Sequence, residues 1–477
     1  MTPHQQADNK KHKPPLSSDL FDVAIIGGGV VGCAVARRFV LEGAKVALVE
    51  KAPDILDGAS KANSAILHTG FDAPKDSVEL ACIREGYEEY RRIRDRFGLT
   101  ESPCGAHVVA WSAEELAQLD TITAKAHENG IADVHRVSSD ALQKAEPYLN
   151  KAALGAVAVP GESIIDPWSA PYAYLAQALE NGAQLFRECE VQGGEFDNGV
   201  WQIQTSRGSL KARCVINCAG LYGDLVDQAV LGKAAFSIIP RKGQFVVYDK
   251  AAAPLISSVI LPVPTQRTKG VVLFNTVFGN LVVGPTAEDQ QSRDDASTSA
   301  KTLTALRAFA EEKLPALKDI PVTTVYAGLR PASDEKEYRI FTTTEKNWIT
   351  VGGIRSTGLS GSLGIARYVF RLYTDMGHSH SPVDNPLVPQ ANVLAQDGLR
   401  DWKAEDPGEI VCHCEMVTRR EIEAALQGPL AARSLAGLKR QTRVTMGRCQ
   451  GFYCTARLAE LTRDHFVLPL ALEGADD

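Results

Sequence analysis

The sequence predicts an α/β protein in three parts: a Rossmann-type nucleotide-binding domain, an antiparallel sheet inserted into it, and a small helical cysteine module at the C-terminus. Three observations lead to this prediction. A strand, a glycine-rich turn, a helix and a second strand follow one another between residues 21 and 50. Segments rich in β-branched residues, separated by Gly and Pro, fill the stretch 235–326. Four of the ten cysteines lie after residue 410.

Length and net charge favour a protein of several domains and argue against a nucleic-acid-binding protein. A chain of 477 residues exceeds the roughly 250–300 residues that one hydrophobic core supports, so we expect several domains. Lys and Arg number 51 against 58 Asp and Glu, a net charge of −7, which lacks the basic field of a nucleic-acid binder. No apolar run reaches the about 20 residues of a membrane span, and the first 20 residues have no signal-peptide core. We therefore expect a cytoplasmic protein with no nucleic-acid partner and no transmembrane segment; peripheral membrane association through a partner stays open.

The predicted parts are interleaved along the chain. The residues at 1–20 are polar and predict a disordered tail, while 377–408 holds four prolines and predicts a linker before a separate cysteine-bearing domain at 409–477. A second glycine turn near residue 358 returns the chain to the first domain after the inserted sheet. The predicted ranges are 21–75, 150–232 and 326–376 for the nucleotide-binding domain and 76–149 and 233–325 for the inserted substrate-binding domain.

The head of the chain carries a dinucleotide fingerprint. In FDVAIIGGGVVGCAVA, Gly27, Gly29 and Gly32 have G-x-G-x-x-G spacing: the first makes the turn, the second admits a pyrophosphate, and the third lets the helix pack closely. The N-terminus of the helix then offers N–H groups and a positive dipole to the phosphates. At the end of the second strand, Glu50 is placed to accept hydrogen bonds from both ribose hydroxyls. NAD and FAD share this pattern, but a fingerprint at the N-terminal end together with a second glycine turn near residue 358 favours the longer cofactor, FAD.

The C-terminal cysteines form two close pairs, Cys412 with Cys414 in C-x-C and Cys449 with Cys454 in C-x4-C. Four thiolates are the usual ligands of a [2Fe-2S] cluster. Zinc also takes four thiolates, but structural zinc sites usually have two to four residues inside each pair, and ordinary buried cysteines are the remaining alternative. Nearby arginines would offset the negative charge of a cluster: Arg419, Arg420, Arg440, Arg443 and Arg448.

Several segments resemble one known family. The loop DGASKANSAILHTGFDAP, with GESIIDPW, NCAGLYGD, YAGLRP and GGIRSTGLSGSLGIA, resembles the FAD-dependent glycerol-3-phosphate dehydrogenases and oxidases of the D-amino-acid-oxidase-like flavoprotein superfamily, from about residue 20 to 375. The ending, with CHC and MGRCQGFYC, looks like a bacterioferritin-associated-ferredoxin-like [2Fe-2S] domain. The resemblance implies an FAD-dependent oxidoreductase that also holds a [2Fe-2S] cluster.

The resemblance also places candidate catalytic residues. His68 in SAILHTG matches the active-site histidine of the family, and imidazoles titrate near neutral pH, as a general base must; the alternative is a histidine that only packs the loop. Arg330 in GLRP, Arg355 in GGIRSTG and Lys242 in PRKGQF are candidates to hold an anionic substrate. Each of the three could instead be an ordinary structural or surface charge.

Further residues are expected to contact FAD. Ser356, Thr357 and Gly358 begin a turn into a helix whose N–H groups would face the flavin edge where negative charge develops on reduction; an ordinary helix start is the alternative. The resemblance implies that Ser60, Lys61 and Asn63 surround the phosphates or the isoalloxazine edge. The predicted set is completed by Lys51, Ser64, Gly220 and Leu359.

Together these features predict a dehydrogenase of glycerol 3-phosphate or a similar anionic secondary alcohol. His68 would take the hydroxyl proton, and the electrons would leave through the cluster to an acceptor: a partner subunit, an electron-transfer protein or the quinone pool. Alternative enzymes are an L-2-hydroxyglutarate-type 2-hydroxy-acid dehydrogenase and an amine or opine dehydrogenase subunit. An electron-transfer or redox-sensing subunit is the non-enzymatic alternative. Thr69, where the family pattern has alanine, is a departure that bears on the substrate.

Overall fold

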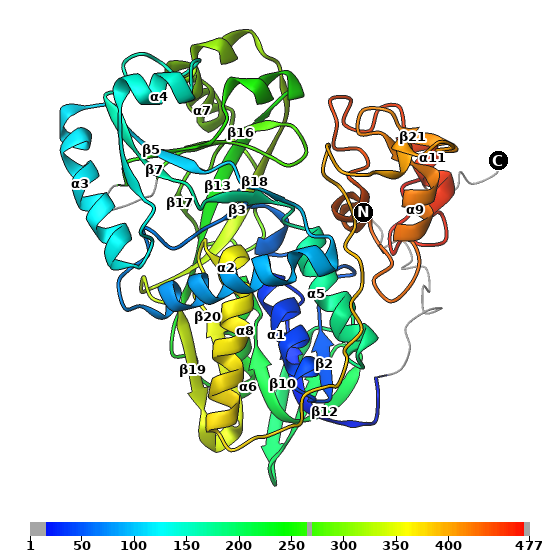
Figure 1. Ribbon diagram of the computed structural model, residues 1–477. Helices are drawn as coiled ribbons and strands as arrows, with labels where there is room; N and C mark the ends of the chain where they lie inside the picture. The colour runs from blue at the N-terminus through cyan, green and yellow to red at the C-terminus, as the bar shows by residue number, and fades with distance from the viewer. Residues whose placement is uncertain (1–15, 265–269, 472–477) are drawn as a thin grey trace.

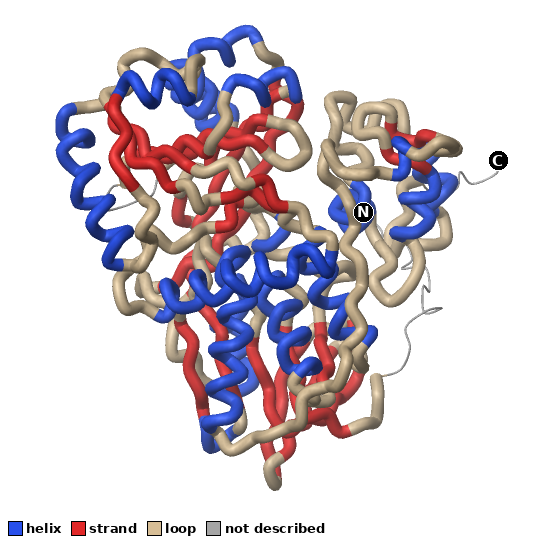
Figure 2. Tube along the Cα trace, viewed as in Figure 1, coloured by secondary structure: helices blue, strands red, loops and turns tan. Residues whose placement is uncertain are grey.

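The computed structural model describes residues 16–264 and 270–471. It confirms the mixed α/β class, since helices and strands alternate through two large bodies (Figures 1 and 2). Most of the predicted disordered tail, residues 1–20, lies outside the described residues, and its last residue, Leu20, begins strand β1. Within the described residues, no helix combines the length and the apolar character needed to cross a bilayer.

An eight-stranded sheet forms the lower body in Figure 1. Strands β1 (Leu20–Ile26), β2 (Val46–Val49) and β12 (Gly208–Asn217) run parallel at its centre, as the predicted strand, helix, strand order requires. Because side chains alternate along a strand, Val23 and Ile25 enter one buried core and Ala24 and Ile26 the other. The other strands of this sheet are β9 (Gln184–Phe186), β10 (Val191–Asp197), β11 (Val200–Thr205), β19 (Arg339–Thr343) and β20 (Trp348–Gly352).

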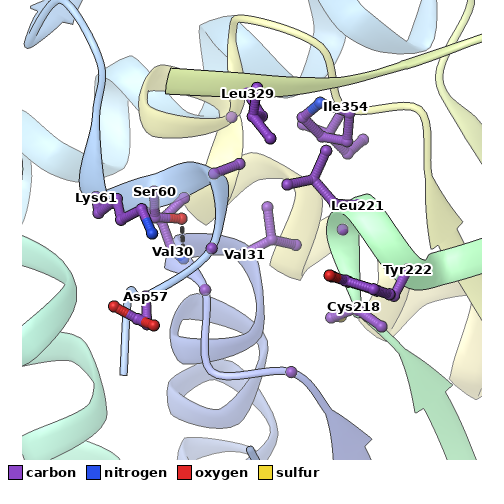
Figure 3. A pocket seen from close by; sticks show the side chains of 18 of the residues that line it. Val30, Val31, Asp57, Ser60, Lys61, Cys218, Leu221, Tyr222, Leu329 and Ile354 are labelled. Atoms are coloured by element: carbon purple, nitrogen blue, oxygen red, sulfur yellow. Dashed lines mark hydrogen bonds between the residues drawn. The ribbon is translucent and has the colours of Figure 1, made fainter. Parts of the chain in front are cut away.

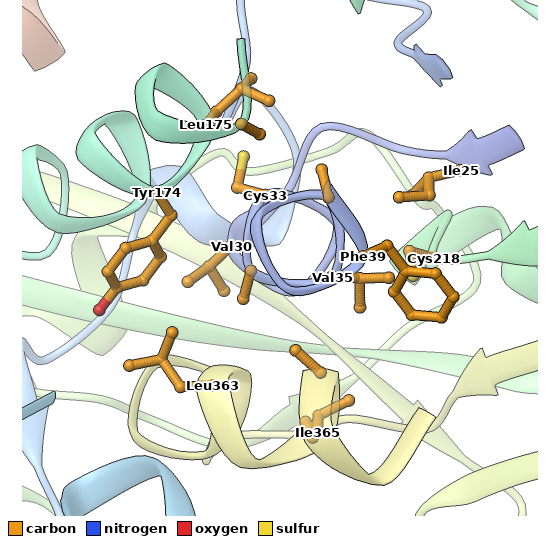
Figure 4. Packing of buried hydrophobic residues seen from close by; sticks show 14 of the residues in the cluster. Ile25, Val30, Cys33, Val35, Phe39, Tyr174, Leu175, Cys218, Leu363 and Ile365 are labelled. Carbon is orange, nitrogen blue, oxygen red and sulfur yellow. The ribbon is translucent and has the colours of Figure 1, made fainter. Parts of the chain in front are cut away.

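Helix α1 (Val30–Leu41) occupies the centre of one of these cores. It packs between α5 (Ser169–Glu180) and α8 (Gly358–Asp375), and α8 packs in turn against α2 (Val78–Phe97). Figure 4 looks along α1, with side chains of α5 on one side and of α8 on another. Helix α6 (Gly223–Leu231) packs with strands β10 and β20. This packing fixes the N-termini of α1 and α8 at the same end of the sheet.

A nine-stranded sheet forms the upper body. Its longest pairing is between β13 (Ile238–Tyr248) and β18 (Val322–Ser333), which are antiparallel and set Arg241 opposite Arg330. The other pairs are antiparallel too, apart from β14 with β5. The sequence assigned residues 150–232 and 326–376 to the nucleotide-binding domain. However, β7 (Gly155–Val159) and part of β18, which lie within these ranges, pair in this sheet. Its remaining elements are β5 (Ala106–Ala110), β6 (His135–Ser138), β7 (Gly155–Val159), β14 (Val259–Pro262), β15 (Val272–Asn275), β16 (Leu281–Gly284), β17 (Glu288–Asp289), α3 (Ala113–Glu128), α4 (Ser139–Ala145) and α7 (Ala300–Lys313).

A short three-stranded sheet joins the two bodies. It consists of β3 (Ile66–Leu67), β8 (Ser163–Ile165) and β4 (Glu101–Ser102). Neighbouring residues on these strands point to opposite sides, so Ile66 enters the core of the upper body and Leu67 that of the lower body. The residue after β3 therefore lies at the junction of the two bodies.

Residues 377–408 follow the lower body in an extended path. The backbone N–H of Val383 donates to the carbonyl oxygen of Leu41 at 2.9 Å, and that of Ala391 donates to Phe97 at 2.7 Å, so the predicted linker is fastened to the ends of α1 and α2. Figure 1 shows this segment rising to a separate small module beside both bodies. The module contains β21 (Ile410–Cys412), β22 (Val417–Thr418), α9 (Arg419–Ala425), α10 (Leu435–Thr442) and α11 (Thr455–Thr462) around a core of its own.

Candidate functional site

A cavity of about 640 Å³ opens where the N-termini of α1 and α8 meet, which is within the usual range for a ligand site. Segments from both bodies line it, including the glycine turn after β1 and the end of β18. Figure 3 shows Val30 and Ser60 on one side of the cavity and Leu329 and Ile354 on another. Predicted site residues that line the cavity are Gly27, Gly29, Glu50, Lys51, Ser60, Lys61, Asn63, Ser64, Gly220, Arg330, Arg355, Ser356, Gly358 and Leu359.

The glycines of the fingerprint have the physical roles that the spacing predicts. Gly27 has φ +107, and a Cβ there would lie 2.5 Å from the carbonyl oxygen of Cys218. A Cβ on Gly32 would lie 1.9 Å from the carbonyl oxygen of Gly27, so Gly32 serves close packing of helix on strand and does not line the cavity. At Gly29 the nearest atom to a Cβ is the Ser60 hydroxyl at 3.3 Å, which leaves this face of the turn open to a ligand.

Two side chains complete the turn. The Ser60 hydroxyl accepts the N–H of Val30 at 3.0 Å, at the start of α1 (Figure 3). The first N–H groups of a helix have no partner within the helix, so a bound anion could accept from them at the same place. The Glu50 carboxylate accepts N–H groups from Gly28 at 2.6 Å and from Ala52 at 2.8 Å, and burial raises its pKa. Each carboxylate oxygen keeps lone pairs for a hydroxyl donor. The turn, the helix start and the acid together fit the adenosine half of a dinucleotide.

The second turn leads into α8, but its residues point in different directions. Ser356 and Gly358 line the cavity. The buried Thr357 does not, because its hydroxyl donates to Glu79 at 2.8 Å and contacts the Tyr338 hydroxyl at 2.6 Å. The Thr357 side chain is therefore held against α2, and only its backbone belongs to the turn.

His68 follows β3 and is held by a buried carboxylate. Its Nδ1 lies 2.7 Å from Oε2 of Glu162, whose other oxygen accepts the N–H and the hydroxyl of Thr69 at 2.7 and 2.9 Å. Glu162 is 0% exposed, whereas 18% of the His68 side chain is exposed. An ionised carboxylate only accepts, so Nδ1 carries the proton and Nε2 keeps its lone pair. The imidazole is thus oriented with a basic nitrogen free, although His68 is not among the residues that line the cavity.

Arg330 brings a partly buried positive charge to the cavity wall. One of its Nη atoms donates to the carbonyl oxygen of Thr286, while its Nε has no hydrogen-bond partner among the described residues. Burial, with repulsion from Arg241, lowers the pKa of Arg330 to about 10, so the guanidinium stays charged at neutral pH. A bound anion would give the buried Nε of Arg330 the hydrogen-bond acceptor that it lacks and would offset the positive charge of the guanidinium.

The other two predicted cations are differently placed. Arg355 also lines the cavity; its Nη2 donates to Glu79 at 3.4 Å, and its Nε lacks a partner in the described part of the chain. Lys242 does not line the cavity, because its Nζ lies 2.8 Å from a carboxylate oxygen of Asp295. Arg330 and Arg355 are therefore brought to one cavity, and Lys242 is engaged in an ion pair beside it.

The four C-terminal cysteines meet in two pairs, each of which joins the two motifs. The thiols of Cys414 and Cys449 are neighbours that influence each other's pKa, and so are those of Cys412 and Cys454. Backbone N–H groups, that of Tyr453 foremost, lower the pKa of the Cys449 thiol, whereas burial raises that of Cys454 to about 12. No group of three or more His, Cys, Asp or Glu is placed to hold one metal ion in the described ranges. Two thiolates at each of two irons are what a [2Fe-2S] cluster takes, so the pairs fit this group.

Comparison with known proteins agrees with this geometry. Residues 22–372 match the model of a family described as "FAD dependent oxidoreductase". This chain belongs to the FAD-dependent oxidoreductases. Residues 410–463 of the oxidoreductase match the "BFD-like [2Fe-2S] binding domain". The enzyme is therefore a flavoprotein that carries a [2Fe-2S] domain, and both predicted cofactors are confirmed.

Two curated relatives align with more than nine tenths of this chain, and a solved structure aligns with 77% of it. A glycerol 3-phosphate dehydrogenase of Caloramator mitchellensis is 31% identical over 450 residues, which cover 93% of this chain and 94% of that protein. A subunit of the anaerobic glycerol-3-phosphate dehydrogenase of Escherichia coli (strain K12) is 25% identical over 495 residues, 92% of this chain and 87% of that one. Among solved structures, an L-α-glycerophosphate oxidase from Mycoplasma pneumoniae with FAD bound superposes with a TM-score of 0.72 at 26% identity, covering 77% of this chain and 97% of that one.

Three residues that position the site escaped the sequence-based prediction. Glu162 orients His68, the Ser360 hydroxyl accepts the backbone N–H of His68 at 2.9 Å, and Glu79 links Thr357 to Arg355. Glu162 lies in GESIIDPW, a segment noted for its resemblance, but nothing in its sequence context pairs it with a histidine 94 residues earlier. Only the β3–β8 pairing brings the two together.

Proposed function

We propose that this enzyme is a dehydrogenase of glycerol 3-phosphate or a closely similar anionic secondary alcohol. The observation that carries the proposal is Arg330, a partly buried guanidinium in the wall of the FAD cavity whose buried Nε has no partner among the described residues. Glycerol 3-phosphate presents a phosphate, and a guanidinium binds phosphate oxygens with two donors at once. The names of the relatives with the same two-part organisation support the same substrate class.

His68 is the base of the proposed reaction. Its protonated Nδ1 faces Glu162, so Nε2 is the nitrogen that accepts the hydroxyl proton of the substrate. The imidazolium that results gains an attractive interaction with the buried carboxylate, which stabilises it as the proton is transferred. Bound FAD supplies the acceptor for the two electrons and the carbinol hydrogen, and the cluster supplies a carrier of single electrons.

A partner that accepts electrons completes the proposal. The cluster is needed only if electrons leave one at a time, so we propose transfer through the cluster to a partner subunit, an electron-transfer protein or the quinone pool. Similarity to a protein named as one subunit of an anaerobic dehydrogenase supports a partner subunit. The proposed ligands are the two cysteine pairs of the C-terminal module.

The test is an anaerobic absorbance experiment on the purified enzyme with both cofactors. We expect glycerol 3-phosphate to bleach the flavin bands, and L-2-hydroxyglutarate at the same concentration to leave them unchanged. Bleaching by L-2-hydroxyglutarate alone would transfer the assignment to a 2-hydroxy acid. If neither compound bleached the flavin bands but an amine or an opine did, the protein would be assigned as an amine or opine dehydrogenase subunit.

A histidine variant tests the base. We expect His68→Ala to lower the rate of flavin bleaching by roughly two to four powers of ten while FAD content stays at the wild-type level, because only proton transfer is removed. The replacement His135→Ala, at an exposed position in strand β6, is the control. A near-normal rate in His68→Ala would remove His68 as the base.

A further inference from the structure

One short segment of the FAD-binding domain contacts both cofactor-bearing parts of the chain. Residues 54–57, here called the strap, follow β2 and end at Asp57, which lines the FAD cavity close to Ser60 and Lys61 (Figure 3). The backbone N–H of Leu56 donates to the carbonyl oxygen of Gly28 at 2.9 Å, in the middle of the glycine turn. Any displacement of the strap is therefore transmitted to the backbone on which the diphosphate is expected to lie.

The strap has an unfavourable local conformation. Leu56 has φ +61 and is fully buried, and a bulky residue in the left-handed region is unfavourable unless its surroundings hold it there. Within the FAD-binding domain, its backbone hydrogen bond to Gly28 contributes to that hold. Asp54 also pairs with Arg187 of the same domain at 3.5 Å, and Ile55 and Leu56 pack in its core. The cluster module adds further contacts.

Helix α10 of the cluster module, together with the serine that caps it, forms hydrogen bonds and an ion pair with the strap. Arg440, 4% exposed, donates to the carbonyl oxygen of Ile55 at 3.1 Å and pairs with Asp57 at 3.3 Å. Asp54 accepts the Ser434 hydroxyl at 2.6 Å, where Ser434 caps the start of α10. A Cβ added to Gly437 would lie 2.3 Å from the Asp54 carboxyl carbon, so helix and strap are in direct contact.

The same helix is tied to the cysteine pairs. Leu438 of α10 packs in one buried core with Cys412 and Cys454. Directly after the helix, Arg443 pairs with Glu415 at 3.0 Å, and Glu415 follows Cys414 in the chain. A cluster that fixes the four cysteines therefore fixes both the packing of α10 and the residues that follow it.

We infer that Arg440 is a positioning residue of the FAD site, supplied by the cluster module. It holds Ile55 and Asp57 so that Leu56 stays in the conformation that supports the glycine turn. The two cofactor sites are then coupled: a loaded cluster raises the affinity for FAD, and FAD raises the stability of the loaded module by the same free energy. This inference depends on the two cofactors and not on the identity of the substrate.

The test compares FAD dissociation constants, measured by flavin fluorescence titration of FAD-stripped protein. We expect cluster-loaded protein to bind FAD about tenfold more tightly than the cluster-free variant Cys449→Ser/Cys454→Ser, within the range usual for coupled sites. Arg440→Gln should weaken FAD binding by a similar factor while iron content stays unchanged, and it should have little further effect in the cluster-free background. Arg457→Gln is the matched control, since Arg457 pairs with Glu409 and Glu460 inside the module.

A second measurement in the wild-type protein does not depend on how the variants fold. FAD should raise the denaturant concentration at which the cluster absorbance is lost, and this shift should disappear in Arg440→Gln. Equal FAD affinity with and without the cluster, together with no such shift, would overturn the inference. An Arg440→Gln protein that keeps both the wild-type FAD affinity and the shift would overturn the role of Arg440.

Discussion

At the scale of single residues, the pairing of His68 with Glu162 carries the most chemical information. A buried carboxylate that accepts from one imidazole nitrogen sets the tautomer and leaves the lone pair on the other nitrogen. Thr69 donates two further hydrogen bonds to the same carboxylate, one from its backbone N–H and one from its hydroxyl, and only the second depends on the side chain. Glu162 is therefore part of the site through His68 and not through contact with the substrate.

Glu162→Gln tests this relation. An amide presents N–H groups where Nδ1–H now donates, which favours the wrong imidazole tautomer, so we expect turnover to fall by about 10²–10⁴ with FAD content and KM little changed. Steady-state kinetics and the flavin absorbance of the same sample give the two readouts. Glu180→Gln, at the exposed end of α5, is the control. Unchanged turnover would mean that the pair is structural only.

Arg330→Gln tests the proposed anion contact. Loss of a charged hydrogen bond costs about 1.5–3 kcal/mol, so KM for glycerol 3-phosphate should rise by roughly 10- to 150-fold. Neutral glycerol at high concentration serves as the internal comparison, because its weak oxidation should not depend on a phosphate-binding cation. An equal loss with glycerol would show that Arg330 supports the fold of the cavity wall.

At the scale of elements, the position of the start of α1 depends on how closely its backbone approaches the glycine turn before it. Gly32 lies against the carbonyl oxygen of Gly27, and the turn is fixed on its other side by Cys218, which follows β12. Helices α5 and α8 hold α1 in this position, and α8 contributes its own N-terminus to the cavity. The two glycine turns are thus brought together by helix packing, although Gly358 lies 326 positions after Gly32 in the sequence.

Gly32→Ala should disrupt this arrangement. A methyl group 1.9 Å from a carbonyl oxygen forces helix and strand apart, so we expect a loss of about 1–3 kcal/mol or more in stability and a lower FAD content. Thermal unfolding and the ratio of flavin to protein absorbance measure both effects. Gly193→Ala, in β10 where the nearest atom would lie 4.0 Å away, should leave both near wild type.

At the scale of the whole molecule, the cluster module rests on both bodies. It contacts the FAD-binding domain through Arg440 and the inserted domain through Arg448, whose guanidinium lies 2.9 Å from Asp249. Gln450 accepts the Thr324 hydroxyl at 3.1 Å beside the cysteine loop. The module therefore contacts both large bodies, an arrangement that suits the proposed transfer of electrons through the cluster.

Removal of the cluster separates the two halves of the proposed reaction. With FAD supplied in excess, Cys449→Ser/Cys454→Ser should still bleach its flavin with substrate, because the substrate cavity is retained. Electron transfer to an artificial one-electron acceptor should fall by at least about tenfold. Stopped-flow absorbance follows both steps in one sample. Acceptor reduction at the wild-type rate would mean that electrons leave directly from FAD.

Local sequence patterns were sufficient for much of the fold. The fingerprint at Gly27, Gly29 and Gly32 predicted the α/β class and the dinucleotide site, because its physics operates within one turn and one helix. The two cysteine motifs predicted the cluster for the same reason. The domain boundaries and the site roles stay predictions, and the pairing of β7 and β18 in the upper sheet had no local signal.

The sequence by itself determined which chemical groups this protein has: glycines for phosphate, a histidine, candidate cations and four thiols, each readable from residue type and short spacing. Tertiary structure alone decided which of them act together. It placed Glu162 against His68, left Arg330 in the cavity wall with an unsatisfied donor while pairing Lys242 with Asp295, and set Arg440 against the strap. These relations depend on contacts between segments far apart in the chain, whose formation is set by the packing of whole sheets and helices and by no local preference.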